Sequence, residues 1–173
     1  KFGEETDTLE KNGSVIKTKS LPTEEKLLNA IKKFNGPQKQ IPPSFSAIHV
    51  DGKRASDLTR KGVDITLPSR DIEIYSSKIL DIRKNKEDKV EYCLIEFTVS
   101  KGTYIRSLAR DIAYECGSVA HLVGLYRTKV GNFSIENSAG YDYLLPFTID
   151  NVINNVILPT DEDIIKKQIL EKK

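Results

Sequence analysis

The chain has 173 residues, of which 38% are hydrophobic and 30% charged, with 27 Lys and Arg against 25 Asp and Glu. This is enough sequence for one domain of ordinary size that buries roughly 70% of its unfolded surface. No apolar run approaches the ~20 residues that span a bilayer, and no signal-peptide pattern opens the sequence. These patterns exclude a membrane-spanning helix and lead us to expect a cytoplasmic protein.

Cysteine and histidine are scarce. Cys93 falls in a predicted strand and Cys116 on the apolar stripe of a predicted helix, so both are interpreted as reduced core residues. With only His49 and His121 and no paired cysteine spacing, we expect no metal site. The chain contains no Met and begins at Lys1, which we interpret as a fragment or a processed piece.

The first third of the chain predicts a hairpin followed by a helix. An Asn-Gly pair at 12–13 lies between two short extended segments and favours a loop or hairpin. A helix is predicted from Thr23, its N-cap, to Phe34, because acids occupy the first turn and apolar residues recur at helical spacing. Asn-Gly-Pro at 35–37 ends this helix.

Residues 41–70 predict a small basic lobe. Ile-Pro-Pro at 41–43 requires extended backbone, residues 45–50 predict a strand, and Asp-Gly at 51–52 predicts a tight turn. Residues 53–61 then predict a short helix. The basic side chains of this region are Lys53, Arg54, Arg60, Lys61 and Arg70. The lobe either contacts a polyanion or is an exposed insertion without a partner. A plain β-hairpin follows, with strands at 71–83 and 90–99.

Arg106 is the most informative residue of the sequence. An apolar stripe predicts a helix from Thr103 to Cys116, ended by Gly117, and Arg106 lies in its first turn. A helix N-terminus carries roughly half a positive charge, so a cation there calls for an anion. That anion is either a phosphate, bound by the free N–H groups of the first turn, or a carboxylate from elsewhere in the fold. The alternative is that Arg106 only pairs with a surface acid.

The remaining segments predict further short elements. Ser118 is expected to cap a short helix that carries Ala120, Leu122 and Leu125. Residues 126–130 alternate as a strand with Arg127 and Lys129 on one face, and Phe133 and Ile135 are expected to return to the core. Residues 159–173 predict a polar amphipathic helix.

Charge distribution points to a polyanion more than net charge does. Residues 101–129 contain five Lys and Arg against two acids. Locally basic faces on a nearly neutral chain are typical of nucleic-acid backbone binding, although such a run is also compatible with a solvated face. Because hairpins outnumber helix crossovers, we expect an α+β fold with a mixed, mainly antiparallel sheet flanked by helices.

Four motifs, in this order, resemble one family: F-G-x-x-T-D-T at 2–8, I-P-P-x-F-S-A-x-x-x-D-G-K-R at 41–54, S-K-G-T-Y-I-R-S-L-A-R-D at 100–111, and A-H-L-x-x-L-x-R-T-x-V-G-x-F at 120–133. The sequence is similar to the tRNA pseudouridine synthases of the TruB type, which isomerise a uridine in the T-loop of tRNA. The resemblance implies that residues 1–158 are part of the catalytic domain, with 41–70 as its RNA-contacting lobe, and that 159–173 form a C-terminal tail.

The resemblance also implies roles for individual residues. Arg106 matches the arginine that pairs with and orients the catalytic aspartate. Tyr104 and Leu125 match residues of the uridine pocket. The residues expected to contact RNA are Lys101, Arg127, Lys129, Arg54 and Arg60. The family needs no metal or organic cofactor, so none is expected here. The T-arm of tRNA is the expected partner, and we expect a monomer.

Some residues depart from the family pattern. The nucleophilic aspartate belongs to a Gly-x-Leu-Asp motif that is not found in this sequence, and neither Asp7 nor Asp111 lies in such a motif. Glu10 stands where the family often has Asp, and Phe45 where it has Tyr. We therefore expect the parent protein to be a tRNA pseudouridine synthase and this chain alone to be inactive. The alternatives are a non-catalytic tRNA-binding module and the related guide-RNA-dependent synthases.

Overall fold

A computed structural model describes residues 1–135 of the chain. These residues fall into two units, one of residues 1–122 and one that begins at Val123, and each is described by itself. The predictions for residues 136–158 and for the tail at 159–173 lie outside the described residues. No helix within residues 1–135 is long and apolar enough to cross a membrane.

The chain opens with the predicted hairpin. Strand β1 (Glu4–Thr6) pairs antiparallel with β2 (Val15–Thr18). The loop between them is organised by Asp7, whose Oδ1 accepts hydrogen bonds from the N–H of Thr8 at 2.8 Å and of Ser14 at 2.9 Å. A Cβ atom at Gly13 would collide with the side chains of Asp7 and Thr8, which explains the glycine at this position.

Helix α1 (Glu24–Phe34) and the long hairpin confirm the sequence prediction. The Thr23 side chain accepts a hydrogen bond from the N–H of Lys26, as an N-cap does. Strands β6 (Arg70–Lys84) and β7 (Val90–Val99) pair antiparallel around the expected charged turn.

One strand of this sheet was not predicted. β3 (Gly36–Gln40) pairs antiparallel with the start of β6. Its sequence, Gly-Pro-Gln-Lys-Gln, has no apolar alternation, and Pro37 is tolerated because β3 is an edge strand. Gln40, at its end, is nevertheless 1% exposed.

The lobe within 41–70 is only partly as predicted. The expected strand at 45–50 is wrong, since only β4 (His49–Val50) is extended and pairs with β5 (Lys53–Arg54). The turn between them is the expected Asp-Gly turn, with positive φ at both residues (50° and 77°), as a type I′ turn requires. Helix α2 (Ala55–Arg60) is shorter than the predicted helix at 53–61.

Helix α3 (Ile105–Glu115) places Arg106 in its first turn, as predicted. Gly117 follows the helix with φ 74°. The short helix expected from Ser118 is absent among the described residues, because the Ser118 hydroxyl donates to the carbonyl of Ser20 at 2.7 Å instead of capping a new helix.

The second unit contains one small hairpin within its described residues. Strand β8 (Lys129–Val130) pairs with β9 (Phe133–Ser134), which confirms the turn at 131–132 and shortens the predicted strand at 126–130. The Phe133 side chain is 83% exposed, so the expectation that it returns to the core is wrong.

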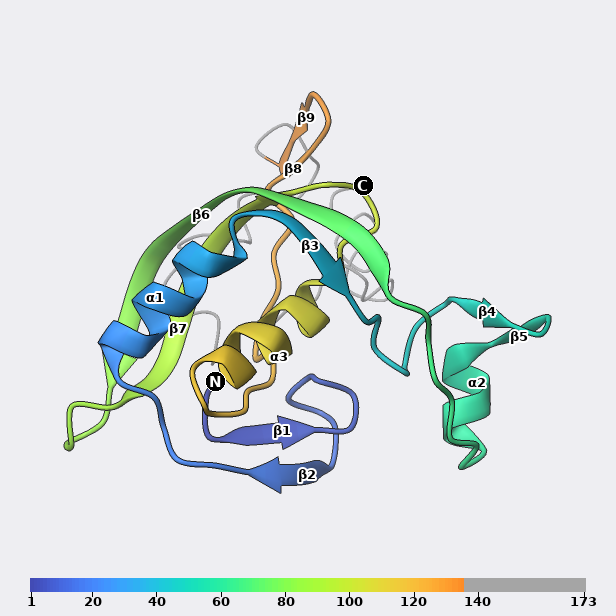
Figure 1. Cartoon of the computed structure of the whole chain (residues 1–173), viewed down its shortest axis with the longest axis horizontal. Helices are drawn as coiled ribbons and strands as arrows, with labels where there is room; N and C mark the ends of the chain where they lie inside the picture. The colour runs from blue at the N-terminus through green and yellow to red at the C-terminus, as the bar shows by residue number, and fades with distance from the viewer. Residues whose placement is uncertain (136–173) are drawn as a thin grey trace, which may run out of the picture. The chain divides into compact units, whose positions relative to one another are not determined.

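The core of the first unit lies between the sheet and the two long helices. Figure 1 shows α1 and α3 side by side beneath the curved β6–β7 hairpin. The buried residues at this contact come from all four elements and include Leu27, Ile31, Ile74, Val90, Leu108 and Ile112. Both cysteines are free, with Cys116 buried and Cys93 packed against the same core. The fold is therefore α+β. Every pairing between named strands in residues 1–135 is antiparallel. We expected a mixed sheet, and the parallel pairing among these residues is one isolated bridge between Glu10 and Leu122.

Candidate functional site

The Arg106 side chain connects three parts of the first unit. From α3, its Nη1 donates to the carbonyl of Thr8 in the β1–β2 loop at 3.0 Å, and its Nη2 donates to the carbonyl of Phe45 at the entry to the lobe at 2.9 Å. Only 20% of this side chain is exposed. The guanidinium is therefore held in one position by carbonyl groups from two loops.

The anion beside Arg106 is a carboxylate of this chain. Glu10 Oε1 lies 3.3 Å from Arg106 Nε, so the guanidinium has a carboxylate of this chain beside it, and the expectation that it orients an aspartate from outside this sequence stays a prediction. This distance exceeds the roughly 2.7–2.9 Å of a strong charge-assisted hydrogen bond, and the Glu10 side chain is 49% exposed. Glu10 is thus a loosely held partner, whereas the two carbonyl groups fix the guanidinium.

Tyr104 is positioned by a buried amide. It is the N-cap residue of α3 but makes no side-chain capping bond. Instead, Gln40 Oε1 accepts from the N–H of Tyr104 at 2.8 Å, and Gln40 Nε2 donates to the carbonyl of Tyr104 at 3.2 Å. These paired hydrogen bonds attach the start of α3 to the end of β3. Sequence reasoning missed both Gln40 and the pairing of Glu10 with Arg106, because each contact joins segments far apart in the sequence.

A second arginine of α3 holds the same connecting segment. Arg110 lies one turn after Arg106; its Nη2 donates to the carbonyl of Ile41 at 2.9 Å, and its Nε donates to Asp111 Oδ1 at 2.8 Å. Burial raises the pKa of Asp111, and the adjacent Arg110 partly offsets this rise. Arg106 and Arg110 therefore hold opposite ends of the segment 41–45 that leads into the lobe.

The other predicted site residues are exposed. Lys101 lies in the turn before α3, Arg54 ends β5, and Arg60, on α2, pairs with Asp57 at 3.3 Å. In the second unit, Leu125 is 43% exposed, and Arg127 and Lys129 are also exposed. The structure brings Arg106 and Tyr104 together at the start of α3, and their roles stay predictions.

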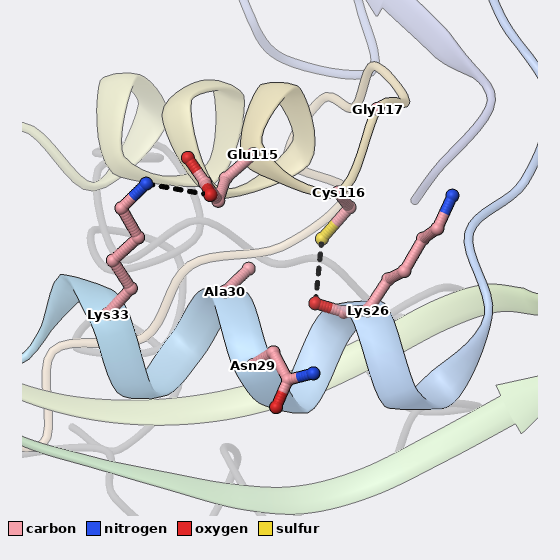
Figure 2. Close-up of a pocket in the computed structure, with 7 residues that line it drawn as sticks. All are labelled: Lys26, Asn29, Ala30, Lys33, Glu115, Cys116 and Gly117. Atoms are coloured by element: carbon pink, nitrogen blue, oxygen red, sulfur yellow. Dashed lines mark hydrogen bonds and ion pairs between the residues drawn. The ribbon is translucent and has the colours of Figure 1, made fainter.

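A hollow of about 350 Å³ lies at the other end of α3 (Figure 2). Its walls come from α1 and the end of α3, where Lys33 Nζ pairs with Glu115 Oε1 at 2.8 Å and the Cys116 thiol points at the carbonyl of Lys26 at 3.7 Å. None of the predicted site residues lines this hollow. Its contacts join two helices, so we assign it to packing. Within residues 1–135 no group of three or more His, Cys, Asp or Glu side chains could hold a metal ion.

The comparison with known proteins decides the family. Residues 1–105 match the model of the TruB family pseudouridylate synthase (N terminal domain), which covers β1 through the first residue of α3. The chain belongs to this family.

Similar proteins from several bacteria share the name tRNA pseudouridine synthase B. The one from Treponema denticola is 42% identical over 161 residues, in an alignment that covers 85% of this chain and 45% of that protein. The one from Clostridium tetani is 39% identical over 175 residues, covering 99% of this chain and 56% of that protein. The one from Rickettsia akari is 41% identical over 139 residues, covering 80% of this chain and 46% of that protein. The chain thus spans about half the length of these TruB relatives.

Asp7 and Asp111 of this TruB-family chain are both held by contacts with neighbouring groups. Asp7 accepts hydrogen bonds from two backbone N–H groups of its own loop, and Asp111 pairs with Arg110. Neither carboxylate forms an ion pair with Arg106. That neither residue is the nucleophile stays a prediction.

Proposed function

We propose that the protein to which this chain belongs isomerises a uridine in the T-loop of tRNA to pseudouridine. The match to the TruB family over residues 1–105 carries this proposal. The arginine expected to orient a catalytic carboxylate is held at the start of α3 by two loop carbonyl groups, which supports it.

The proposed chemistry needs a carboxylate nucleophile and a base removed from its stack. The base is flipped out of the T-arm and held against apolar and aromatic side chains, for which we propose Tyr104 and Leu125. A carboxylate attacks the nucleoside and forms a covalent bond, and the bond from C1′ to N1 breaks. The base then rotates and C5 bonds to C1′; the carboxylate is released, the C5 proton is lost to solvent and N1 takes up a proton. We propose that this carboxylate is an aspartate outside these 173 residues and that Arg106 orients it.

The loose contact between Glu10 and Arg106 allows such a pairing. Two carbonyl groups hold both terminal nitrogens of the guanidinium, so its position does not depend on Glu10. The half-exposed Glu10 carboxylate is able to move into solvent at little energetic expense. Nε is then available to a second carboxylate. Arg106 in this proposal keeps the nucleophile ionised and aimed at the nucleoside.

The test is tritium release from a tRNA transcript labelled at uridine C5. We expect no release with the 173-residue chain alone and release when the polypeptide encoded upstream of Lys1 is restored or added in trans. An Arg106→Ala variant of the restored protein should lose most of this activity. A restored protein that binds tRNA but releases no tritium would support the alternative of a non-catalytic tRNA-binding module.

Lys101, Arg127 and Lys129, with Arg54 and Arg60 of the lobe, are the proposed RNA contacts of this function. Each phosphate contact removed by substitution should reduce the slope of log affinity against log salt by about 0.7–0.9. A substitution that leaves the slope unchanged excludes that residue from the contact surface.

A further inference from the structure

Arg70 has an unusual environment for a cationic side chain. It begins β6, and its Nε is buried without a hydrogen-bond partner. Within residues 1–135 the Arg70 side chain makes no ion pair or hydrogen bond, whereas Arg60, Arg106 and Arg110 each pair with an acid. A buried donor left without an acceptor destabilises the fold. Arg70 is therefore a cation that no acid among the described residues balances.

The Arg70 side chain lies next to Tyr104. The guanidinium carbon lies 5.6 Å from the centroid of the Tyr104 ring. Arg70 is also the cross-strand partner of Gln40, the residue that holds the Tyr104 backbone. Two cross-strand partners thus contact Tyr104: Gln40 binds its backbone, and Arg70 lies over its ring.

The turn before α3 brings its backbone close to the Arg70 guanidinium. Gly102 has φ 83°, and a Cβ atom there would lie 3.7 Å from Arg70 Nη1, so the backbone of this turn lies against the guanidinium. Lys101, the preceding residue, is exposed and makes no ion pair in the described part of the chain. Two cations without acid partners therefore flank Gly102.

We propose that Arg70, with Lys101, binds a phosphodiester group of RNA beside Tyr104. This inference rests on the proposed function, since it makes the ligand part of the tRNA whose base contacts Tyr104. A planar guanidinium is suited to bidentate phosphate recognition, and the cation–π contact with the Tyr104 ring restricts where it lies. Arg70 thus adds to the RNA-binding residues a phosphate contact at the pocket itself.

The experiment measures binding of an unmodified tRNA transcript by the 173-residue chain across salt concentrations. R70Q should weaken binding, and its slope of log affinity against log salt should be smaller than wild type by about 0.7–0.9. Between about 50 and about 200 mM salt, the ratio of the two dissociation constants should therefore shrink about threefold. R70K keeps the charge, so its slope should stay close to wild type.

Lys39 provides the matched control. It occupies the register position next to Gln40 and pairs with Asp71 at 2.9 Å, so its charge already has a partner. K39Q removes the same unit of charge from the same strand pair and should leave the salt slope unchanged. A cooperative unfolding transition in urea, measured for each variant, shows that the variant is folded.

The possible outcomes separate the two proposals. Equal loss of affinity in R70Q and R70K with the wild-type slope would mean that Arg70 only supports the Tyr104 ring, and would overturn the phosphate site. Equal slope changes in R70Q and K39Q would also overturn it, because net charge alone would then explain the effect. If the wild-type chain binds tRNA no better than an unrelated single-stranded RNA, the proposed function is at fault, not the site.

Discussion

At the scale of single residues, the candidate site depends on side chains that bind backbone groups. Arg106, Arg110 and Gln40 all bind carbonyl or N–H groups of distant segments. Such contacts fix where loops lie relative to α3, and they leave the position of the guanidinium independent of the exposed Glu10 carboxylate. The residue that defines the site is thus stabilised mainly by hydrogen bonds and only weakly by an ion pair.

The first prediction compares the two partners of the Arg106–Glu10 pair. Glu10→Gln should lower the free energy of unfolding by less than about 1 kcal/mol, because an exposed ion pair contributes little. Arg106→Ala should lower it by roughly 2–3 kcal/mol, because the charged donor of two carbonyl groups is lost. Urea unfolding measures both values. Equal losses in the two variants would show that the ion pair, and not the carbonyl contacts, holds the guanidinium.

The second prediction concerns the Gln40 amide. Gln40→Leu should lower the free energy of unfolding by roughly 1–3 kcal/mol, since it leaves the partly buried N–H of Tyr104 without its acceptor. The Tyr104 carbonyl loses one of two donors and keeps the N–H of Leu108. Gln38→Leu on the same strand is the control; its side chain makes one exposed hydrogen bond, to the Lys33 carbonyl, so we expect a change within about 0.5 kcal/mol. Similar losses in the two variants, measured in urea, would contradict the assigned role of Gln40.

At the scale of elements, the sequence predicts those helices and strands whose position is set by local features such as apolar periodicity, caps and turns. Helix α1, the β6–β7 hairpin and α3 each have a clear apolar period together with a cap or a turn, and all three were predicted within one or two residues. Strand β3 was missed because it forms through pairing with β6, which no apolar alternation in Gly-Pro-Gln-Lys-Gln indicates. The helix expected after Ser118 does not form because that hydroxyl binds Ser20, nearly a hundred residues earlier.

In the candidate site, too, the local features were predictable from the sequence and the long-range contacts were not. The position of Arg106 in the first turn of α3 and its need for an anion were predictable from the local pattern. Glu10 was not predictable as its partner, because the pairing joins residues 96 positions apart. Local sequence thus locates the candidate side chain, and tertiary structure selects what it binds.

The third prediction compares Gly117, which follows α3, with Gly13, which lies in the β1–β2 loop. Gly117 follows α3 with φ 74° and open space around a hypothetical Cβ, so Gly117→Ala should cost only the backbone penalty of about 1–2 kcal/mol. Gly13 has a different constraint, since a Cβ atom there would collide with Asp7 and Thr8. Gly13→Ala should therefore also displace the loop that supplies the Thr8 carbonyl to Arg106.

Urea unfolding and tRNA affinity distinguish the two variants. G117A should change stability without changing affinity, whereas G13A should change both. If G13A bound tRNA with wild-type affinity and salt slope, the β1–β2 loop would not contribute to positioning Arg106.

At the scale of the whole first unit, the start of the chain is joined to the segment after α3. Phe2 forms a bridge with Ala120, and the N–H of Gly3 donates to the carbonyl of Val119 at 2.9 Å. His121 extends this junction with a ring that is only 6% exposed and an Nδ1 that lies 2.9 Å from the carbonyl of Glu4. Because a carbonyl only accepts, Nδ1 carries the proton in this contact, so the neutral ring satisfies it. Folding of the unit is therefore linked to the protonation of a buried imidazole.

The fourth prediction is a loss of stability on mild acidification. Burial lowers the pKa of His121 below its usual value near 6.5, and positive charge on Lys1 acts in the same direction, while Glu4 opposes it. Between the unfolded and the folded pKa the unfolded chain binds more protons, so the free energy of unfolding falls as pH decreases through this range. One such group contributes a slope of at most about 1.4 kcal/mol per pH unit.

His121→Asn isolates this contribution. An Asn side chain can donate to the Glu4 carbonyl but does not titrate, so the difference between the wild-type and variant curves belongs to the imidazole. From about pH 7.5 to about pH 5.5, urea unfolding should show a steeper loss for wild type than for H121N. Parallel curves would mean that His121 is as easily protonated in the folded unit as in the unfolded chain.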